Sequence, residues 1–314
     1  MNKLDFMKKN SRWYFLSEVI KLGRLPFLGA GLILYATGAV LAGIGRGYLP
    51  LDQFIMGYAI VMPAHLSVSY SNDYYDFELD NPEAATVYTG GSGVLQRHPE
   101  LRGFAWKFAV LLISVSLTLA AIHTLIYRNP AVLLLAVAGN LLGWFYSAPP
   151  ARLSYRGLGE VATALTGFIF PAMGYSVIMG VIDTPLILFS IPIMLLQLVF
   201  IINVEIPDLR EDLLGGKMTF PVRRGVRVSR RVMALSAAAA TVSLGLLEFY
   251  PHFDPGISFP IIALLSLTVT VPCIYYYIHN PEEVNVRGSE VVMNSLIAFG
   301  VLDLLYLISV LVMQ

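Results

Sequence analysis

Long apolar segments alternate with polar connections along almost the whole chain. Nine segments are mostly apolar and have about 20 residues each, the length that an α-helix needs to cross a bilayer core of about 30 Å. They lie near residues 26–44, 51–70, 104–127, 130–147, 158–181, 184–203, 230–248, 257–278 and 290–312. None shows the alternation of apolar and polar residues typical of a membrane β-strand. The pattern therefore predicts an all-α fold, a polytopic membrane bundle of nine transmembrane helices.

The connections between these segments differ in length. Those at 45–50, 128–129 and 181–183 are short, whereas the two longest lie at about 71–103 and 204–229. Long connections in a compact bundle are usually functional. We expect residues 1–314 to form a single transmembrane domain with its active site under these two loops.

The composition agrees with a protein of the lipid bilayer. Hydrophobic residues make up 56% of the chain and charged residues 13%, against about 25% charged in a soluble domain. The mean hydropathy is +0.68. The formal net charge is zero, so nothing favours nucleic acid as a partner. Cys273 is the one cysteine of the sequence, which excludes an intrachain disulfide and a zinc site built from thiols.

Lys and Arg residues gather on alternate connections. With the N-terminus in the cytoplasm, all but two of the 21 Lys and Arg residues fall on the cytoplasmic side; the exceptions are Arg46 and Arg128. Cytoplasmic connections of membrane proteins carry an excess of these residues. We therefore expect a multi-pass protein of the cell membrane with a cytoplasmic N-terminus and with both long loops, and hence the active site, facing the cytoplasm.

Both long loops begin with acidic clusters. In SNDYYDFELD (71–80), Asn72, Asp76 and Asp80 are spaced i, i+4 and i+8, and in EIPDLRED (205–212), Asp208 and Asp212 repeat the four-residue step. On a helix this spacing places the side chains on one face, where like charges repel. A divalent cation would compensate that repulsion, and carboxylate and amide oxygens suit a hard ion such as Mg²⁺.

The two clusters follow the second and the sixth predicted span, so they lie at the same membrane face. Two facing carboxylate clusters can hold Mg²⁺ ions on one diphosphate, which draws charge off a leaving group and lets an allylic carbon–oxygen bond ionise. The alternative interpretation is that these are solvated loop acids without a shared role. The matched spacing and depth favour a shared site.

A diphosphate also needs cations and hydrogen-bond donors. Lys217 follows the second cluster in GGKMT (215–219), and a glycine-rich stretch, TGGSGVLQR (89–97), follows the first as a candidate cap. Arg24, Tyr146 and Arg152 are further candidates at span ends. Each has a plainer explanation, as a topology determinant or as part of an interfacial aromatic belt.

At these residues the chain resembles the UbiA family of intramembrane aromatic prenyltransferases. The family's first motif, N-x-x-x-D-x-x-x-D, is met by Asn72, Asp76 and Asp80, and its second, D-x-x-x-D followed by G-K-x-T, by Asp208 and Asp212 with GKMT (216–219). NDYYD, TGGSGVL, YSAPPARL, RGLGE and the E-x-P-D start of the second motif are most similar to the MenA-type branch, which prenylates 1,4-dihydroxy-2-naphthoate in menaquinone synthesis.

The resemblance implies nine transmembrane helices and a magnesium-dependent reaction. Asn72, Asp76, Asp80, Asp208 and Asp212 would hold Mg²⁺ on a polyprenyl diphosphate, with Asp76 and Asp208 central to catalysis. The leaving diphosphate would be steadied by Arg24, Tyr146, Arg152 and Lys217. An aromatic acceptor, oriented or deprotonated by Glu205, would then attack the allylic cation.

Two alternatives to this function stay open from the sequence. The same chemistry serves other acceptors, such as 4-hydroxybenzoate, homogentisate, a chlorophyllide, haem or a glycerol phosphate ether. A transporter of a cation or an anionic metabolite is the alternative from another class, since intramembrane carboxylates often mark transport pathways. The clustering of the acids at one membrane face, away from the midplane, disfavours transport.

Overall fold

The computed structural model of the chain describes residues 12–78 and 91–314. Within these residues, nine helices have 18 or more residues. They are α3 (Leu25–Arg46), α4 (Leu51–Tyr75), α6 (Arg102–Tyr127), α7 (Pro130–Ser147), α8 (Gly159–Met179), α9 (Thr184–Glu205), α11 (Phe220–Leu246), α12 (Phe259–His279) and α13 (Val286–Met313). The shorter elements are α2 (Arg12–Leu22), α5 (Val94–Arg97), α10 (Leu209–Leu214) and the 3₁₀ turns η1 (Pro99–Leu101), η2 (Leu153–Arg156) and η3 (Leu247–Phe249).

The predicted all-α fold is confirmed, because the part of the chain that the structure describes contains helices and no strand. Eight of the long helices are apolar and long enough to cross a membrane. The helix outside that set is α4, which carries the first acidic cluster at its end. The count of nine spans and the side on which the N-terminus lies stay predictions.

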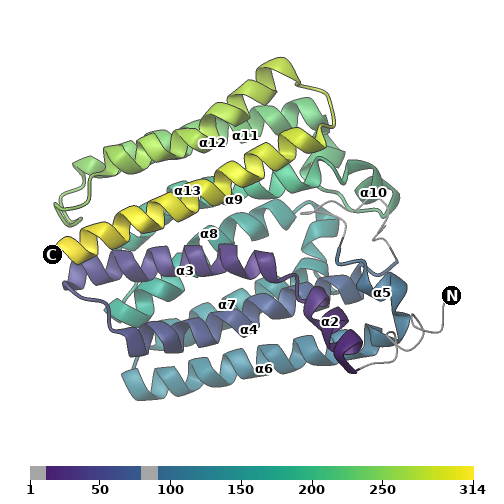
Figure 1. Cartoon of the computed structure of the whole chain (residues 1–314), viewed down its shortest axis with the longest axis horizontal. Coiled ribbons are helices and arrows are strands. Elements are labelled where there is room, and N and C mark those ends of the chain that lie inside the picture. Colours follow the sequence, from purple (N-terminus) through teal and green to yellow (C-terminus); the bar gives the residue numbers. More distant parts are fainter. Residues whose placement is uncertain (1–11, 79–90) are drawn as a thin grey trace.

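The long helices lie side by side in a bundle (Figure 1). Helices α3, α8 and α9 pack in succession through its middle; α4, α6 and α7 cover one flank, α11 and α12 the other, and α13 packs on both α12 and α3. The short helices α2, α5 and α10 gather at one end of the bundle, and the C-terminus lies at the opposite end. These three short helices therefore mark the end to which both long loops belong.

Polar side chains begin several of the long helices. Asn129 accepts a hydrogen bond from the Ala131 backbone N–H at the start of α7, and Asp183 accepts one from Leu186 at the start of α9. Such N-caps satisfy a backbone donor that the helix itself leaves unpaired and stabilise it by about 1 kcal/mol.

Glycines let the central helices approach closely. A Cβ atom on Gly38 of α3 would collide with the carbonyl oxygen of Pro171, and one on Gly174 of α8 would collide with that of Tyr35. Small residues at helix interfaces permit this backbone contact in membrane proteins. Helices α3 and α8 therefore pack closely against each other in the middle of the bundle.

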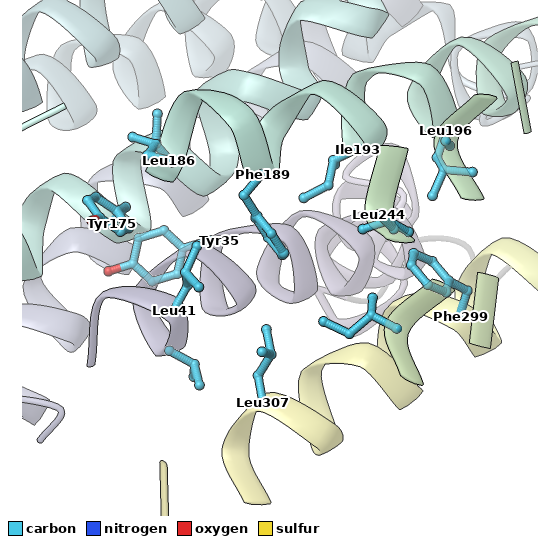
Figure 2. Close-up of a cluster of buried hydrophobic side chains, with 14 of the residues drawn as sticks. Tyr35, Leu41, Tyr175, Leu186, Phe189, Ile193, Leu196, Leu244, Phe299 and Leu307 are labelled. Carbon is cyan, nitrogen blue, oxygen red and sulfur yellow. The ribbon is translucent and has the colours of Figure 1, made fainter. Parts of the chain in front are cut away.

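The main hydrophobic core includes buried side chains from helices on both flanks of this pair. Figure 2 shows buried side chains that converge from α3, α8, α9, α11 and α13, among them Tyr35, Phe189, Leu244, Phe299 and Leu307. In contrast, the outward faces expose large apolar side chains, such as Leu125 on α6, which is 79% exposed. An apolar exterior over a packed interior is typical of a protein that lies in lipid, and the chain is an integral membrane protein.

Candidate active site

The two acidic motifs face one cavity of about 390 Å³ at the end of the bundle that carries the short helices. Asn72 and Asp76 reach it from the end of α4, and Asp208 and Asp212 reach it from α10 and the residue before it. The predicted meeting of the two motifs is therefore seen in the structure. Asp80, the third member of the first motif, lies outside the described residues.

The cavity carries its acidic side chains at one end, and most of the side chains along the rest of its length are apolar. Its lining residues on α4 run from Ile60 to Asp76, which at a helical rise of about 1.5 Å per residue is a length of about 24 Å. Beyond the acidic end the walls include Leu34, Leu135 and Met173 from α3, α7 and α8. A ligand with a charged head and a long apolar tail matches this division.

Asp76 is held by donors from three separate segments. Its Oδ2 accepts hydrogen bonds from Lys217 Nζ at 2.9 Å and from Ser147 Oγ at 3.2 Å. Its Oδ1 accepts one from the Tyr155 hydroxyl at 2.7 Å. Because donors contact both oxygens, the orientation of the Asp76 side chain at the cavity is fixed.

Tyr155 is a member of the site that the sequence reasoning did not single out. It lies in η2, and burial together with the charge of Asp76 raises the pKa of its phenol, which keeps the proton on the hydroxyl that donates to Asp76. The signal in the sequence was the stretch YSAPPARLSYRGLGE, but its tyrosine at 155 had no spacing that linked it to a carboxylate.

The second motif forms a compact turn. The Asp212 backbone N–H donates to the Asp208 carbonyl at 2.8 Å, and the Lys217 N–H donates to the Asp212 carbonyl at 2.9 Å. The Thr219 hydroxyl donates to Asp212 Oδ2 at 3.1 Å. Burial raises the pKa of Asp212 to about 7, Lys217 opposes this rise, and Asp208 adds repulsion. A cation in this turn would relieve that repulsion.

The first motif contributes an amide oxygen without a hydrogen-bond partner. Asn72 Oδ1 is buried and has no partner among the described residues, although the side chain lines the cavity. The neighbouring Asp73 accepts a short hydrogen bond from the Ser92 hydroxyl, which ties the described part of the glycine-rich stretch to the end of α4. Gly91 of that stretch also lines the cavity, in agreement with its expected place over the site.

The donor set fits magnesium. Asn72 Oδ1 is an unsatisfied hard oxygen beside Asp76, and the carboxylates of Asp208 and Asp212 line the same cavity. No three His, Cys, Asp or Glu side chains among residues 12–78 and 91–314 form a ready-made metal cluster. Mg²⁺ typically takes one or two protein carboxylates and completes its shell with water and substrate phosphate, so this sparse set suits it.

The predicted diphosphate-binding residues divide into two groups. Arg24, Tyr146 and Lys217 line the cavity. Arg152 does not line it; its guanidinium lies over the ring of Tyr155, 4.7 Å from the centroid. Any action of Arg152 on a ligand in the cavity would therefore pass through Tyr155 and Asp76.

Glu205 ends α9 beside the cavity. It is 6% exposed, lines the cavity, and neither carboxyl oxygen has a hydrogen-bond partner among the described residues. Glu205 and Lys217 both act electrostatically on the phenol of Tyr146. A buried polar atom normally has a partner, so the unpaired oxygens of Glu205 are available to a ligand in the cavity.

This geometry agrees with the family assignment. The chain belongs to the UbiA prenyltransferase family, whose sequence profile matches residues 31–295. It is thus a prenyltransferase, as the resemblance of its motifs predicts, and the shared profile covers both acidic motifs.

Curated relatives and solved structures support the same family. The chain is 23% identical over 268 residues to the 1,4-dihydroxy-2-naphthoate octaprenyltransferase of Bacillus subtilis (strain 168), covering 84% of this chain and 83% of that protein. It is also 23% identical over 251 residues to the protoheme IX farnesyltransferase of Protochlamydia amoebophila (strain UWE25), covering 79% and 81%.

The fold is that of a UbiA homologue from Archaeoglobus fulgidus whose structure holds GPP and Mg²⁺. That structure superposes with a TM-score of 0.70 at 21% identity, over 93% of this chain and 99% of the homologue. The homologue binds the ion that the acidic motifs of this chain predict.

Proposed function

We propose that this prenyltransferase transfers a polyprenyl group from its diphosphate to an aromatic acceptor, and that the acceptor is 1,4-dihydroxy-2-naphthoate, as in menaquinone biosynthesis. The observation that carries the proposal is the cavity itself, in which both acidic motifs face one chamber with a long apolar extension. The similarity to the Bacillus subtilis octaprenyltransferase supports the acceptor and the donor class.

The metal would be held at the polar end of the cavity. Asn72, Asp76, Asp208 and Asp212 provide its oxygen ligands, and the sequence adds Asp80. When bound, Mg²⁺ supplies positive charge that stabilises the departing diphosphate. The buried, unsatisfied Oδ1 of Asn72 supports this assignment, because a buried acceptor normally has a partner.

Cationic residues of the chain would orient the diphosphate. Arg24, just before α3, and Lys217, in the loop after α10, both line the cavity, and Tyr146 adds a hydroxyl to its lining. Lys217 contacts Asp76 directly, so it can neutralise the carboxylate in the absence of donor and turn to the diphosphate when donor binds. Arg152 and Tyr155 keep Asp76 in place.

The apolar part of the cavity would hold the prenyl tail and exclude water. Leu34, Ile60, Leu135, Phe170 and Met173 line it. An allylic cation formed next to these walls has no water to capture it, so it survives until the aromatic ring attacks. Glu205, which also lines the cavity, would orient the acceptor or take its proton.

The active site would face the cytoplasm. All but two of the 21 Lys and Arg residues fall on the side of the two long loops when the predicted spans are followed along the chain. Placement of the carboxylates at one end of the bundle supports an enzyme over a transporter, whose ligand site is usually near the midplane.

A product screen tests the proposal. Membranes that contain the protein are supplied with Mg²⁺, prenyl diphosphates from C10 to C40 and a panel of acceptors, and products are identified by mass spectrometry. We expect prenylated product with 1,4-dihydroxy-2-naphthoate. Product formed only with another acceptor, such as haem or 4-hydroxybenzoate, would reject the proposed acceptor, and ion flux in liposomes without product would reject the prenyl-transfer assignment.

A further inference from the structure

The N-terminal helix α2 exposes a row of large apolar side chains. Trp13, Leu16 and Ile20 are 80%, 46% and 46% exposed. Their spacing of three and four residues places them on one face of the helix. Apolar side chains that gather on one exposed face mark a surface that binds a membrane or another protein. These three side chains form the apolar face of α2.

The opposite face of α2 is packed against the protein. Glu18 is buried, and its carboxylate lies 3.3 Å from the Arg97 guanidinium. The Val19 carbonyl accepts a hydrogen bond from the Tyr70 hydroxyl at 2.7 Å. Leu22 is fully buried in a cluster with residues of α4, α5 and α6. These contacts fix the rotation of α2, so that its apolar face points away from the protein.

The apolar face of α2 continues into surfaces that lie in lipid. Leu25, the first residue of α3, is exposed, and α3 is long and apolar enough to cross a membrane. Phe15 packs edge-to-face on Phe104 in the first turn of α6, and the nearby Trp106 is exposed. In Figure 1, α2 runs across the direction of the long helices at their end. A helix placed in this way lies along the membrane surface, where Trp and aliphatic side chains enter the boundary between headgroups and acyl chains.

The protein side of α2 contacts residues 91–98, here named the α5 segment. Glu18 of α2 pairs with Arg97 of this segment. The Tyr14 hydroxyl and His98 Nε2 are joined by a hydrogen bond of 3.0 Å. Helix α5 itself packs in the same buried cluster as α2. Helix α2 therefore supports the α5 segment from outside.

The α5 segment is connected in turn to the acidic end of the cavity. The Ser92 hydroxyl donates a hydrogen bond to Asp73 at the end of α4. The Gln96 amide donates one to the Phe77 carbonyl at 3.0 Å. Gly91 lines the cavity. The position of α2 is thus linked, through this segment, to the place where the diphosphate is proposed to bind.

We propose that the apolar face of α2 binds the lipid bilayer at its interface, and that this docking holds the α5 segment against the acidic end of the cavity. The occupant is the boundary between lipid headgroups and acyl chains, because the side chains of the face are apolar and uncharged and include a tryptophan. Helix α2 has 11 residues, and isolated helices shorter than about 12–15 residues are marginal in water. Burial of the apolar face in lipid would stabilise such a short helix.

Quenching of Trp13 fluorescence tests the docking. In Trp106→Phe/Trp144→Phe protein, Trp13 is the one tryptophan left. The full chain is placed in lipid nanodiscs that contain lipids brominated near the headgroup end of the acyl chain. These lipids should quench Trp13 strongly, and acrylamide in the water should quench it weakly. Leu16→Cys labelled with an environment-sensitive fluorophore gives the same readout with the natural tryptophans, because Cys273 is buried.

Two results of the quenching experiment would overturn the docking. Strong quenching by acrylamide and none by the brominated lipids would show that the apolar face lies in water. Protection from both quenchers would show that a protein surface, such as a second copy of the chain, covers the face instead of lipid.

Loss of the apolar face tests the link to the α5 segment. Leu16→Gln/Ile20→Gln removes two apolar side chains while helix propensity stays high. The amides of the α5 segment should then lose protection from hydrogen exchange, relative to the wild type. Leu125→Gln/Ile126→Gln is the matched control, because it removes two exposed apolar side chains at the far end of α6. The control should keep the wild-type protection.

The two parts of the proposal can fail separately. If the double variant of α2 loses the quenching by lipid but keeps the wild-type exchange of the α5 segment, docking does not hold that segment. If the control loses as much protection as the double variant of α2, the effect does not come from α2, and the link is wrong as well. Neither measurement needs turnover, so both results are independent of the proposed function.

Discussion

Lys217 Nζ lies 2.9 Å from Asp76 Oδ2, although the two residues belong to opposite acidic motifs. Their ion pair is mostly buried, with the lysine side chain 16% and the aspartate side chain 8% exposed. The contact joins the loop after α10 to the end of α4 across the mouth of the cavity. The second motif therefore contacts the first directly through its lysine, while its carboxylates line the same cavity.

Removal of this lysine should impair the enzyme more than removal of a surface lysine. Lys217→Ala is expected to lower kcat/KM for the prenyl diphosphate by about 10²–10³-fold, because a positioned cation at a developing anion is lost. Lys107→Ala, on the exposed surface of α6, is the matched control. Steady-state kinetics with both variants checks this, and wild-type kinetics in Lys217→Ala would exclude the lysine from diphosphate binding.

Carboxylate variants should abolish turnover and the response to metal together. We expect Asp76→Ala and Asp208→Ala each to lose activity while the fold is kept. In the wild type, Mg²⁺ with a diphosphate analogue at 100 times its Kd should stabilise the protein by about 2.7 kcal/mol through ligand linkage. That gain should vanish in both variants and after chelation with EDTA.

Asp52→Ala is the control for this experiment, because Asp52 lies in the first turn of α4, at the far end of the helix from Asp76. Thermal unfolding in detergent measures the stabilisation. Full activity in either cavity variant would show that its carboxylate does not hold the metal.

The Tyr155 hydroxyl should affect magnesium binding through its hydrogen bond to Asp76. Tyr155→Phe removes a 2.7 Å hydrogen bond to the carboxylate and should lower magnesium affinity about 10–100-fold, as is usual when the partner of a metal ligand is lost. Tyr127→Phe is a matched control, since Tyr127 donates to Asp52 at the other end of the bundle. Magnesium titrations of activity compare the two, and equal affinities would mean that Tyr155 has no part in the site.

Acid should loosen the N-terminal helix α2. Its Glu18 is 2% exposed and pairs with Lys21 at 2.6 Å and Arg97 at 3.3 Å. Burial raises the pKa of Glu18, but the two cations outweigh it and lower the pKa below its usual 4.5. A lowered carboxyl pKa gives stability that is present above the unfolded value and is lost as the pH falls through the folded value.

Trp13 offers a probe of this change, because it lies on α2 and is 80% exposed. In a Trp106→Phe/Trp144→Phe background, Trp13 fluorescence should change below pH 4.5 in the wild-type helix. Glu18→Gln should remove that acid-dependent step. If Trp13 fluorescence depends on pH identically in both proteins, the ion pairs of Glu18 do not hold α2 against the rest of the protein.

The local patterns of the sequence were sufficient for the fold class and for the main members of the site. Apolar segments of helical length predicted the long helices, and the structure has a helix at each of the nine segments within the residues that it describes. The four-residue spacing of Asn72 and Asp76, and of Asp208 and Asp212, predicted side chains on one face, and all four line the cavity. These features depend on residues close together in the chain.

The partners of those residues could not be predicted in the same way. Tyr155 and Ser147 donate to Asp76 from 79 and 71 residues away, and Lys217 does so from 141 residues away. Arg152, a predicted diphosphate-binding residue, does not line the cavity, and its guanidinium lies over the Tyr155 ring. Which of several nearby cations faces the cavity depends on the path of the loop and on the rotation of each helix.

The sequence by itself determined that helices would span a membrane and that each long loop would start with a face of oxygen ligands, because helical periodicity and apolar length are local properties. Only the tertiary structure decided that Glu205 lines the cavity, whereas Glu160 does not line it and lies 3.6 Å from Arg223. That arrangement results from the packing of α8 on α9 and of α9 on α11, which no spacing along the chain records. The chemistry of single residues is therefore readable from the chain, whereas which of them line the cavity is a property of helix packing.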